Sequence, residues 1–234
     1  MASYVNEYKV KFIERIERTP ATVSYRFNVP NAFSFVAGQY MLVNLDKGQI
    51  HPLSLSDCPE ETSFIEFTKR MTGSPYCKRL EELTEGELIS VKGPLGSFNC
   101  DESDANIAMI AGGIGITPIR SILKSQEKQK SDNCKITLIY GNLNRDDVAF
   151  RDELEGLKIP GFKLVHVLSN PSGIKNAYKG FVTAGIIAEE VPNYQNVTYM
   201  ISGPPLMVDA MQKIAATLNI PSEQIRTDVF LGYD

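Results

Sequence analysis

The second half of the chain alternates short apolar runs with amphipathic stretches, and this alternation limits the fold more than any other feature of the sequence. The apolar run 107–111, for example, is followed by a stretch with helical spacing over 118–129. Strands that alternate with helices build a parallel sheet that is covered on both faces. We therefore predict an α/β domain over residues 102–234. Its predicted strands lie at 107–111, 135–140, 163–168, 198–201 and 226–230, and its predicted helices at 118–129, 150–157, 183–190 and 204–218.

The first half of the chain has a different pattern. Short runs rich in Val, Ile, Tyr, Phe and Thr are interrupted by turn residues at the interval typical of a small antiparallel barrel. A polar, turn-rich segment at 100–104 separates the two patterns, which predicts a barrel domain over residues 1–101. A single helix at 75–83, with Pro75 in its first turn, should plug one end of the barrel. The predicted strands lie at 8–17, 21–28, 39–44, 51–56, 63–69 and 88–92.

The composition argues against several classes of protein. Of the 234 residues, 43% are hydrophobic and 22% are charged, which is enough apolar material for two packed cores. A net charge of −4 provides no basic surface for a nucleic acid. No apolar run reaches the roughly 20 residues of a membrane span, and the N-terminus lacks the pattern of a secretory signal, so we expect a cytoplasmic protein. The cysteines Cys58, Cys77, Cys100 and Cys134 are at least 19 residues apart, which is not the spacing of a zinc or iron–sulfur site, and we expect no metal.

A glycine-rich turn follows the strand predicted at 107–111 and precedes a helix. Gly112, Gly113 and Gly115 let the backbone turn tightly and approach a pyrophosphate, while the free N–H groups at the start of the helix attract the anion. Pro118 fixes φ at what we predict to be the first helical position. The turn therefore predicts a dinucleotide site. A valine at Gly115 should block the pyrophosphate and resist any positive φ that the turn requires.

A second turn of this kind, Ser202-Gly203-Pro204-Pro205, also follows a strand and begins a helix. Because the carboxyl ends of parallel strands meet at one edge of a sheet, the two turns should face a shared ligand.

Two segments of the barrel half could also bind a ligand. The strand that contains His51, Pro52, Leu53 and Ser54 is polar at alternate positions inside an otherwise apolar domain. The segment 73–77 precedes the helix and offers free N–H groups to a phosphate. Each segment has an equally good alternative interpretation, which is an exposed strand face for the first and an ordinary helix N-terminus for the second.

Five motifs follow one another along the chain. They are 38–40 (Gly-Gln-Tyr), 51–54 (His-Pro-Leu-Ser), 93–98 (Gly-Pro-Leu-Gly-Ser-Phe), 112–118 (Gly-Gly-Ile-Gly-Ile-Thr-Pro) and 202–205 (Ser-Gly-Pro-Pro). In this order they resemble the ferredoxin–NADP reductase superfamily, and the resemblance spans nearly the whole chain. The segments 138–141, 150–154 and 180–183 fit the same superfamily.

The resemblance implies a Greek-key barrel that binds FAD and a Rossmann-like domain that binds NADH or NADPH, with the nicotinamide meeting the flavin ring between them. It implies three catalytic positions, which are Ser54 near flavin N5, Thr117 beside the nicotinamide, and Ser202, where many members have a cysteine. The implied cofactor-binding residues are His51, Pro52, Leu53, Ser54, Gly73, Ser74, Tyr76 and Cys77 for FAD, Gly112, Gly113, Gly115, Thr117, Pro118, Gly203 and Pro204 for NAD(P)H, and the C-terminal aromatics Phe230 and Tyr233.

The function implied is that of a flavoprotein reductase, which passes hydride from NAD(P)H to FAD and electrons to an external acceptor such as a ferredoxin, another redox protein or free flavin. Hydride transfer needs no acid or base in its central step, so the protein has to orient two rings and exclude water. Two alternatives stay open. The chain could be a flavin reductase that uses free flavin as its substrate, or a non-catalytic electron-transfer subunit of a larger complex.

The chain departs from the superfamily pattern at positions that affect cofactor binding. The flavin motif usually begins with Arg and has an aromatic residue in third place, where this chain has His51 and Leu53. A neutral His is a poorer phosphate partner than a bidentate Arg, so we expect weak FAD binding, with FMN as the less favoured flavin. Tyr233 is predicted to stack on the flavin and Phe230 to anchor the tail in the core. Asn170 brings no charge to a 2′-phosphate, which favours NADH over NADPH, although Lys175 and Lys179 in the following loop could supply that charge instead.

Overall fold

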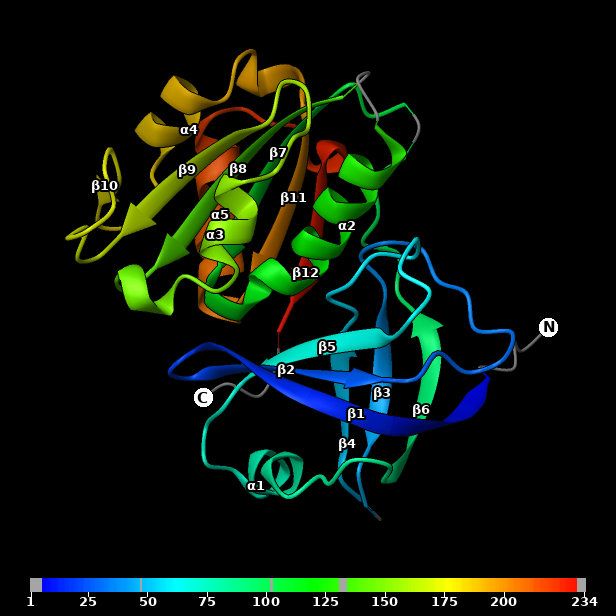
Figure 1. Ribbon diagram of the computed structural model, residues 1–234. Helices are drawn as coiled ribbons and strands as arrows, with labels where there is room; N and C mark the ends of the chain where they lie inside the picture. The colour runs from blue at the N-terminus through cyan, green and yellow to red at the C-terminus, as the bar shows by residue number, and fades with distance from the viewer. Residues whose placement is uncertain (1–5, 47, 102, 131–133, 231–234) are drawn as a thin grey trace.

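The computed structural model describes residues 6–46, 48–101, 103–130 and 134–230, and in this part of the chain it shows two domains, each built on a six-stranded sheet (Figure 1). The first sheet is antiparallel and the second is parallel. This is the fold class that the sequence predicts. None of the described helices is long and apolar enough to cross a membrane.

The antiparallel sheet forms a barrel around an aromatic core. Its strands occur in the order β4-β3-β6-β1-β2-β5, and an isolated bridge between Leu55 and Phe67 joins the two edges. Inside, the ring of Phe67 stacks on both Tyr25 and Phe27, with ring centroids 5.6 and 5.3 Å apart. The elements are β1 (Glu7–Thr19), β2 (Thr22–Phe27), β3 (Tyr40–Asn44), β4 (Ile50–Ser54), β5 (Ile65–Arg70), α1 (Pro75–Glu81) and β6 (Leu88–Leu95).

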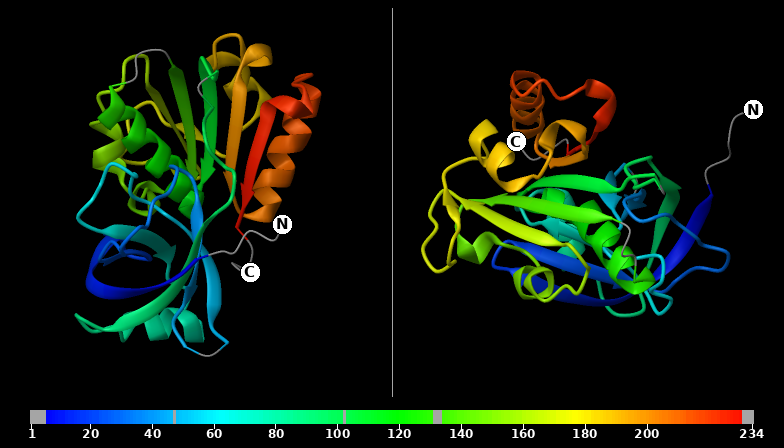
Figure 2. Two further views of the ribbon diagram at one scale, coloured as in Figure 1. Left: turned by 90° about the vertical axis from the view of Figure 1, so that its right-hand side faces the viewer. Right: turned by 90° about the horizontal axis from the view of Figure 1, so that it is seen from above.

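The parallel sheet has the order β10-β9-β8-β7-β11-β12. Helices α2 and α3 cover one of its faces, and α4 and α5 cover the other (Figures 1 and 2). The elements are β7 (Asn106–Gly112), α2 (Ile116–Gln129), β8 (Lys135–Asn142), α3 (Arg151–Glu155), β9 (Lys163–Leu168), β10 (Tyr178–Lys179), α4 (Ala184–Glu190), β11 (Thr198–Gly203), α5 (Pro205–Thr217) and β12 (Ile225–Val229).

The observed elements match the predicted ones except at a few ends. Helix α2 begins at Ile116, so Pro118 is the third helical residue and not the first. A proline is tolerated there because the N–H groups of the first turn have no partner inside the helix. Helix α3 begins only after Phe150, which adopts a left-handed conformation with φ of 60°, and it ends at Glu155, two residues before the predicted end. The short strand β10 was not predicted.

A buried group of charged residues holds the two domains together. We call it the interdomain ion cluster and define it as Arg18, Arg26 and Glu66 of the barrel and Arg120 and Glu153 of the α/β domain. Arg120 of α2 donates to Glu66 Oε1 at 2.9 Å and to Glu153 at 2.7 and 2.8 Å. Glu66 Oε2 also accepts from Arg18 at 3.0 Å and from Arg26 at 2.9 Å. Because Glu66 is 0% and Arg120 2% exposed, this contact between the domains is shielded from water.

Asp57 lies beside this cluster with an incomplete set of hydrogen bonds. Its Oδ1 accepts the N–H of Glu66 at 3.0 Å, but its Oδ2 is buried and has no hydrogen-bond partner. Burial raises the pKa of Asp57 to about 8, and the nearby charge of Glu66 raises it further, against the effect of hydrogen bonds and Arg120. The folded protein therefore holds a proton on Asp57 at neutral pH.

This proton gives a pH-dependent stability. Between the ordinary pKa of an Asp and the raised value of about 8, the folded chain binds a proton that the unfolded chain has lost, so stability falls as the pH rises through this range. We expect Asp57→Asn to flatten the fall between about pH 5 and about pH 8, measured from urea midpoints. The exposed Asp146→Asn is the control and should keep the wild-type slope. Equal slopes in wild type and Asp57→Asn would contradict this assignment.

Candidate active site

The two predicted turns lie next to each other at one edge of the parallel sheet. Strands β7 and β11 are neighbours, and Ala111 pairs with Ser202 just before the turns begin. A Cβ added to Gly115 would lie 2.7 Å from the Gly203 Cα and 2.5 Å from the Ser202 carbonyl carbon. The prediction that both turns face the same edge is confirmed.

The glycines of the first turn have different roles from the one predicted. Gly113 adopts a positive φ of 51° with open space around its Cα, whereas Gly115 has an ordinary φ of −59°. The prediction that the turn could require a positive φ at Gly115 is therefore wrong. Gly115 is needed because the backbone of Ser202 and Gly203 leaves no room for a side chain.

A cavity of about 530 Å³ opens at this edge, and residues of both domains line it. The α/β domain contributes Gly112, Gly113 and Pro204, and the barrel contributes Arg70 and Thr22. Most of the lining is apolar, while the glycine turn presents backbone without side chains. An apolar cavity with a few placed polar groups and an exposed glycine backbone fits a dinucleotide.

Thr117 and Ser202, two of the predicted catalytic residues, lie behind this cavity. Thr117 is 1% exposed, and its hydroxyl donates to the Ile114 carbonyl at 3.1 Å, which braces the glycine turn. Ser202 is fully buried, and its Oγ has no hydrogen-bond partner. Neither side chain lines the cavity, and their catalytic roles stay predictions.

Ser54, the third predicted catalytic residue, contacts a residue that sequence reasoning missed. The hydroxyl of Ser54 in the barrel lies close enough to the carboxyl of Asp228 in β12, across the domain boundary, to influence its pKa. Burial raises the pKa of Asp228 to about 6, although the Ser54 hydroxyl opposes the shift. Asp228 pairs with Ser202 at the edge that carries both turns, and this position in the last strand was the signal that could have identified it.

Two aromatic residues near the C-terminus, Phe230 and Tyr233, were predicted to contribute to the flavin site. The Phe230 N–H donates to the Gly203 carbonyl at 3.0 Å, which fixes the end of β12 to the second turn. Its side chain is half-buried, and its role as a core anchor stays a prediction. Tyr233 lies outside the described residues, and its stacking on the flavin stays a prediction.

The barrel side of the site is formed by β4 and the start of α1. The rings of His51 and Tyr76 are 4.0 Å apart between centroids, and the Tyr76 hydroxyl donates to the Val43 carbonyl at 3.2 Å. Burial and the charge of Lys69 lower the pKa of His51, so this side chain is neutral at pH 7. Pro52 is exposed, whereas Leu53 is 4% exposed and packs in the barrel core. A contact between Leu53 and a flavin stays a prediction.

The segment before α1 forms a capped helix start. Gly73 has a φ of 70° and open space around it, and the Ser74 Oγ accepts the Cys77 N–H at 3.2 Å. The Cys77 thiol is buried and accepts the Thr72 N–H at 3.5 Å. Burial raises the pKa of this thiol, but the hydrogen bonds of Ser74 and Thr72 outweigh burial and lower it. The open backbone at Gly73 fits the approach of a phosphate.

Comparisons with known proteins agree with this arrangement. Residues 9–100 match the oxidoreductase FAD-binding domain family, and residues 109–213 match the oxidoreductase NAD-binding domain family. The chain is 37% identical over 228 residues to NADH-cytochrome b5 reductase 1 of Aspergillus terreus, which covers 88% of this chain and 77% of that protein. It is 31% identical over 224 residues to NADH-cytochrome b5 reductase 1 of Mortierella alpina, which covers 90% and 74%.

Solved structures share the two-domain fold. The cytochrome b5 reductase domain of Ulva prolifera nitrate reductase superposes with a TM-score of 0.83 at 20% identity and covers 97% of this chain and 100% of that chain. A ferredoxin NADP+ reductase from Neisseria gonorrhoeae superposes with a TM-score of 0.80 at 17% identity and covers 95% and 98%.

The fold, the domain matches and the cavity between the domains define an NAD(P)H-dependent flavoprotein oxidoreductase. Within this class, the chain belongs to the ferredoxin–NADP reductase superfamily, which also contains the cytochrome b5 reductases that it matches. Its cofactors are FAD and a nicotinamide coenzyme.

A prediction about FAD binding concerns His51. If His51 faces the flavin phosphate, His51→Arg adds a charged, bidentate donor, so FAD binding should tighten by about 1–3 kcal/mol. The measurement is an FAD titration followed by flavin fluorescence. His51→Gln is the matched control and should bring no gain. If the wild-type chain keeps its FAD through exhaustive dialysis and His51→Arg binds FAD no more tightly, His51 does not limit the affinity for FAD.

Proposed function

We propose that this chain transfers electrons from NADH, through FAD, to a small haem protein of the cytochrome b5 type. The observation that carries the proposal is the similarity to the NADH-cytochrome b5 reductases of Aspergillus terreus and Mortierella alpina, at 37% and 31% identity over most of both chains. Ferredoxin, which the sequence also suggested as an acceptor, has weaker support, because it enters only through structures of low sequence identity.

The site supports this function by positioning two rings. FAD accepts a hydride and can release its electrons singly, which suits a one-electron haem acceptor. In the proposed arrangement, Gly112 and Gly113 expose backbone to the coenzyme pyrophosphate. The approach of Ser54 to Asp228 brings the two domains together at the edge that carries both turns.

The experiment that tests the proposal compares acceptors. The chain loaded with FAD is mixed with NADH and either the soluble haem domain of a cytochrome b5, a plant-type ferredoxin, or free FMN. The proposal expects haem reduction that saturates with cytochrome b5 and exceeds the rates with the other two acceptors. A chain that reduces a dye rapidly but reduces cytochrome b5 no faster than ferredoxin would refute the proposed acceptor.

A second candidate, a reductase of free flavin, is favoured by one observation. His51 is neutral at pH 7, so the flavin site lacks a charge at the first position of the β4 motif. A protein that is yellow after gel filtration supports bound FAD as a prosthetic group. A colourless protein whose rate rises with added flavin supports this second candidate.

The coenzyme preference gives a further prediction. Ser169 lines the coenzyme cavity and Asn170 follows it without a charge, so a 2′-phosphate gains no ion pair at this position. We expect kcat/KM to be higher with NADH than with NADPH. Asn170→Arg should raise kcat/KM for NADPH by about tenfold and leave that for NADH nearly unchanged. The prediction is overturned if the wild-type kcat/KM with NADPH is well above the wild-type kcat/KM with NADH.

A further inference from the structure

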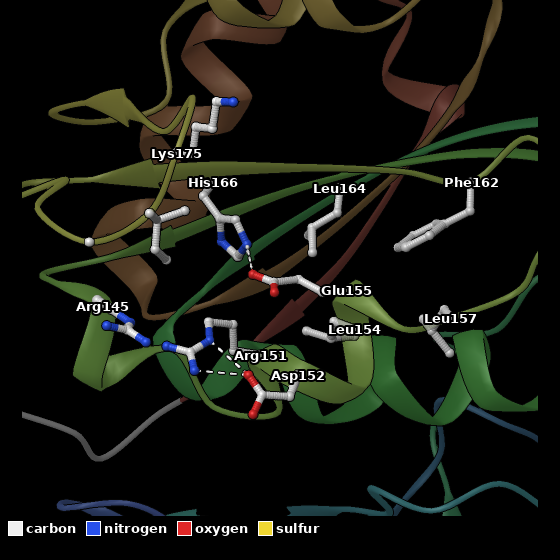
Figure 3. A pocket seen from close by; sticks show the side chains of 12 residues that line it. Arg145, Arg151, Asp152, Leu154, Glu155, Leu157, Phe162, Leu164, His166 and Lys175 are labelled. Atoms are coloured by element: carbon white, nitrogen blue, oxygen red, sulfur yellow. Dashed lines mark hydrogen bonds and ion pairs between the residues drawn. The ribbon is translucent and has the colours of Figure 1, made fainter.

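A second cavity, of about 540 Å³, lies on the α/β domain between α3, β9 and the loop that follows β9 (Figure 3). It shares no lining residue with the coenzyme cavity. The loop contributes Gly173, Ile174 and Lys175, and the segment before α3 contributes Arg145. Nothing in the proposed electron transfer uses these residues.

The floor of this cavity is apolar. It is formed by residues of α3, of β9 and of the turns next to them, namely Leu154, Leu157, Phe162, Leu164 and Ile174. All except Leu154 are only partly buried by the protein, so an aromatic or aliphatic group placed there would remove further apolar surface from water.

One side of the cavity carries two arginines, of which only the exposed Arg145 lacks an ion-pair partner among the described residues. Arg145 forms no ion pair or side-chain hydrogen bond with any described residue, and its Cδ would lie 2.9 Å from a Cβ added to Gly173. Arg151 pairs at 2.8 Å with Asp152, whose side chain is 85% exposed, so water screens this pair. Figure 3 shows the two guanidinium groups directed toward each other. Two like charges in this arrangement favour an anion between them.

His166 adds an unused polar group to the same cavity. Its side chain is 8% exposed, its Nδ1 has no hydrogen-bond partner, and its Nε2 lies 3.5 Å from Glu155 Oε1. Burial lowers the pKa of His166, against the attraction of Glu155, which leaves the ring neutral at pH 7. A neutral imidazole has one donor and one acceptor to offer.

We propose that this cavity is a second ligand site, which binds a small organic anion. Arg145 and Arg151 hold its carboxylate or phosphate group, His166 hydrogen-bonds to it, and its ring or chain rests on Leu164 and Phe162. The proposed site is distinct from the coenzyme cavity, because the two cavities share no lining residue.

The experiment uses the fact that the chain has 2 histidines, His51 and His166. Imidazole signals in a ¹H–¹⁵N spectrum therefore report on this cavity and on the flavin site separately, and His51→Gln assigns them. The FAD-loaded chain, saturated with NAD⁺, is titrated with benzoate, phenyl phosphate and the neutral benzamide. The proposal expects benzoate or phenyl phosphate to shift the His166 signal and leave the His51 signal in place, and benzamide to have little effect.

Variants separate a built site from a general attraction of anions. Arg145→Gln removes one charge-assisted contact and should weaken binding by about tenfold or more. Lys158→Gln removes an exposed charge outside the cavity and should leave binding unchanged. The proposal is overturned if neither anion shifts the His166 signal, or if Arg145→Gln binds the anions as tightly as wild type. It is also overturned if the anions bind only when NAD⁺ is absent.

Discussion

Gly115→Ala is expected to slow NADH-driven reduction of FAD by about 100-fold or more, because a misplacement of about 1 Å at the reacting groups can have an effect of this size. The φ of Gly115 is −59°, which alanine adopts without strain, so the effect is purely steric. The new Cβ would lie 2.7 Å from the Gly203 Cα and closer still to the Ser202 carbonyl. The two turns that face the coenzyme would have to move apart.

Gly113→Ala is the matched control. Gly113 has a positive φ of 51° but nothing within 4 Å of the added Cβ, so alanine there meets only backbone strain of about 1–2 kcal/mol. We expect a much smaller loss of rate than with Gly115→Ala. Single-turnover mixing with NADH under anaerobic conditions measures the rates, and FAD binding confirms that the barrel is intact. Equal rates in Gly115→Ala and wild type would show that the contact between the turns does not position the coenzyme.

Glu66→Gln is expected to lower the free energy of unfolding by about 3–5 kcal/mol, because it removes the buried carboxylate that three arginines share. Glu66 is fully buried and accepts hydrogen bonds from Arg18, Arg26 and Arg120. Burial opposes its ionisation, but Arg120 and the other two arginines hold the pKa of Glu66 below its ordinary value. Since Arg120 belongs to α2 and Glu66 to β5, the loss should also loosen the contact between the domains.

Glu14→Gln is the control for this variant. Glu14 pairs with Arg26 at 2.8 Å, but its side chain is 49% exposed, so its removal should change the free energy of unfolding by less than about 1 kcal/mol. Denaturant unfolding of the two variants and wild type, at one pH and with saturating FAD, gives the comparison. If Glu66→Gln is no less stable than Glu14→Gln, the interdomain ion cluster does not stabilise the assembly of the two domains.

The strands and helices could be predicted because their periodicity and turn residues are local signals. The apolar run before Gly112 predicts β7, and the helical spacing of the residues from Pro118 onward predicts most of α2. The failures depend on tertiary contacts. Phe150 has its ring under the Arg120 guanidinium, 4.2 Å from ring centroid to Cζ, and adopts a left-handed conformation, so it precedes the helix that was predicted to include it. The two residues of β10 are too few to show any periodicity.

The site was predictable where the backbone itself forms it. Glycine turns after strands are visible in the sequence, and the structure brings both turns together. Asp228 was missed because an acidic residue in a terminal strand is unremarkable until the fold places it against Ser54 of the other domain. Likewise, the cluster of Glu66 and Arg120 joins residues 54 positions apart in the chain, and neither belongs to a recognisable motif.

In the proposed electron transfer, the two domains hold FAD and NADH so that a hydride passes between them, and one anaerobic titration measures this transfer. The chain is loaded with FAD, freed of excess flavin, and titrated with NADH while the flavin spectrum is recorded. A hydride carries two electrons, so we expect full bleaching of the oxidised flavin at about one NADH per bound FAD. A chain that binds both molecules by calorimetry, yet keeps the spectrum of oxidised FAD in excess NADH, would contradict it.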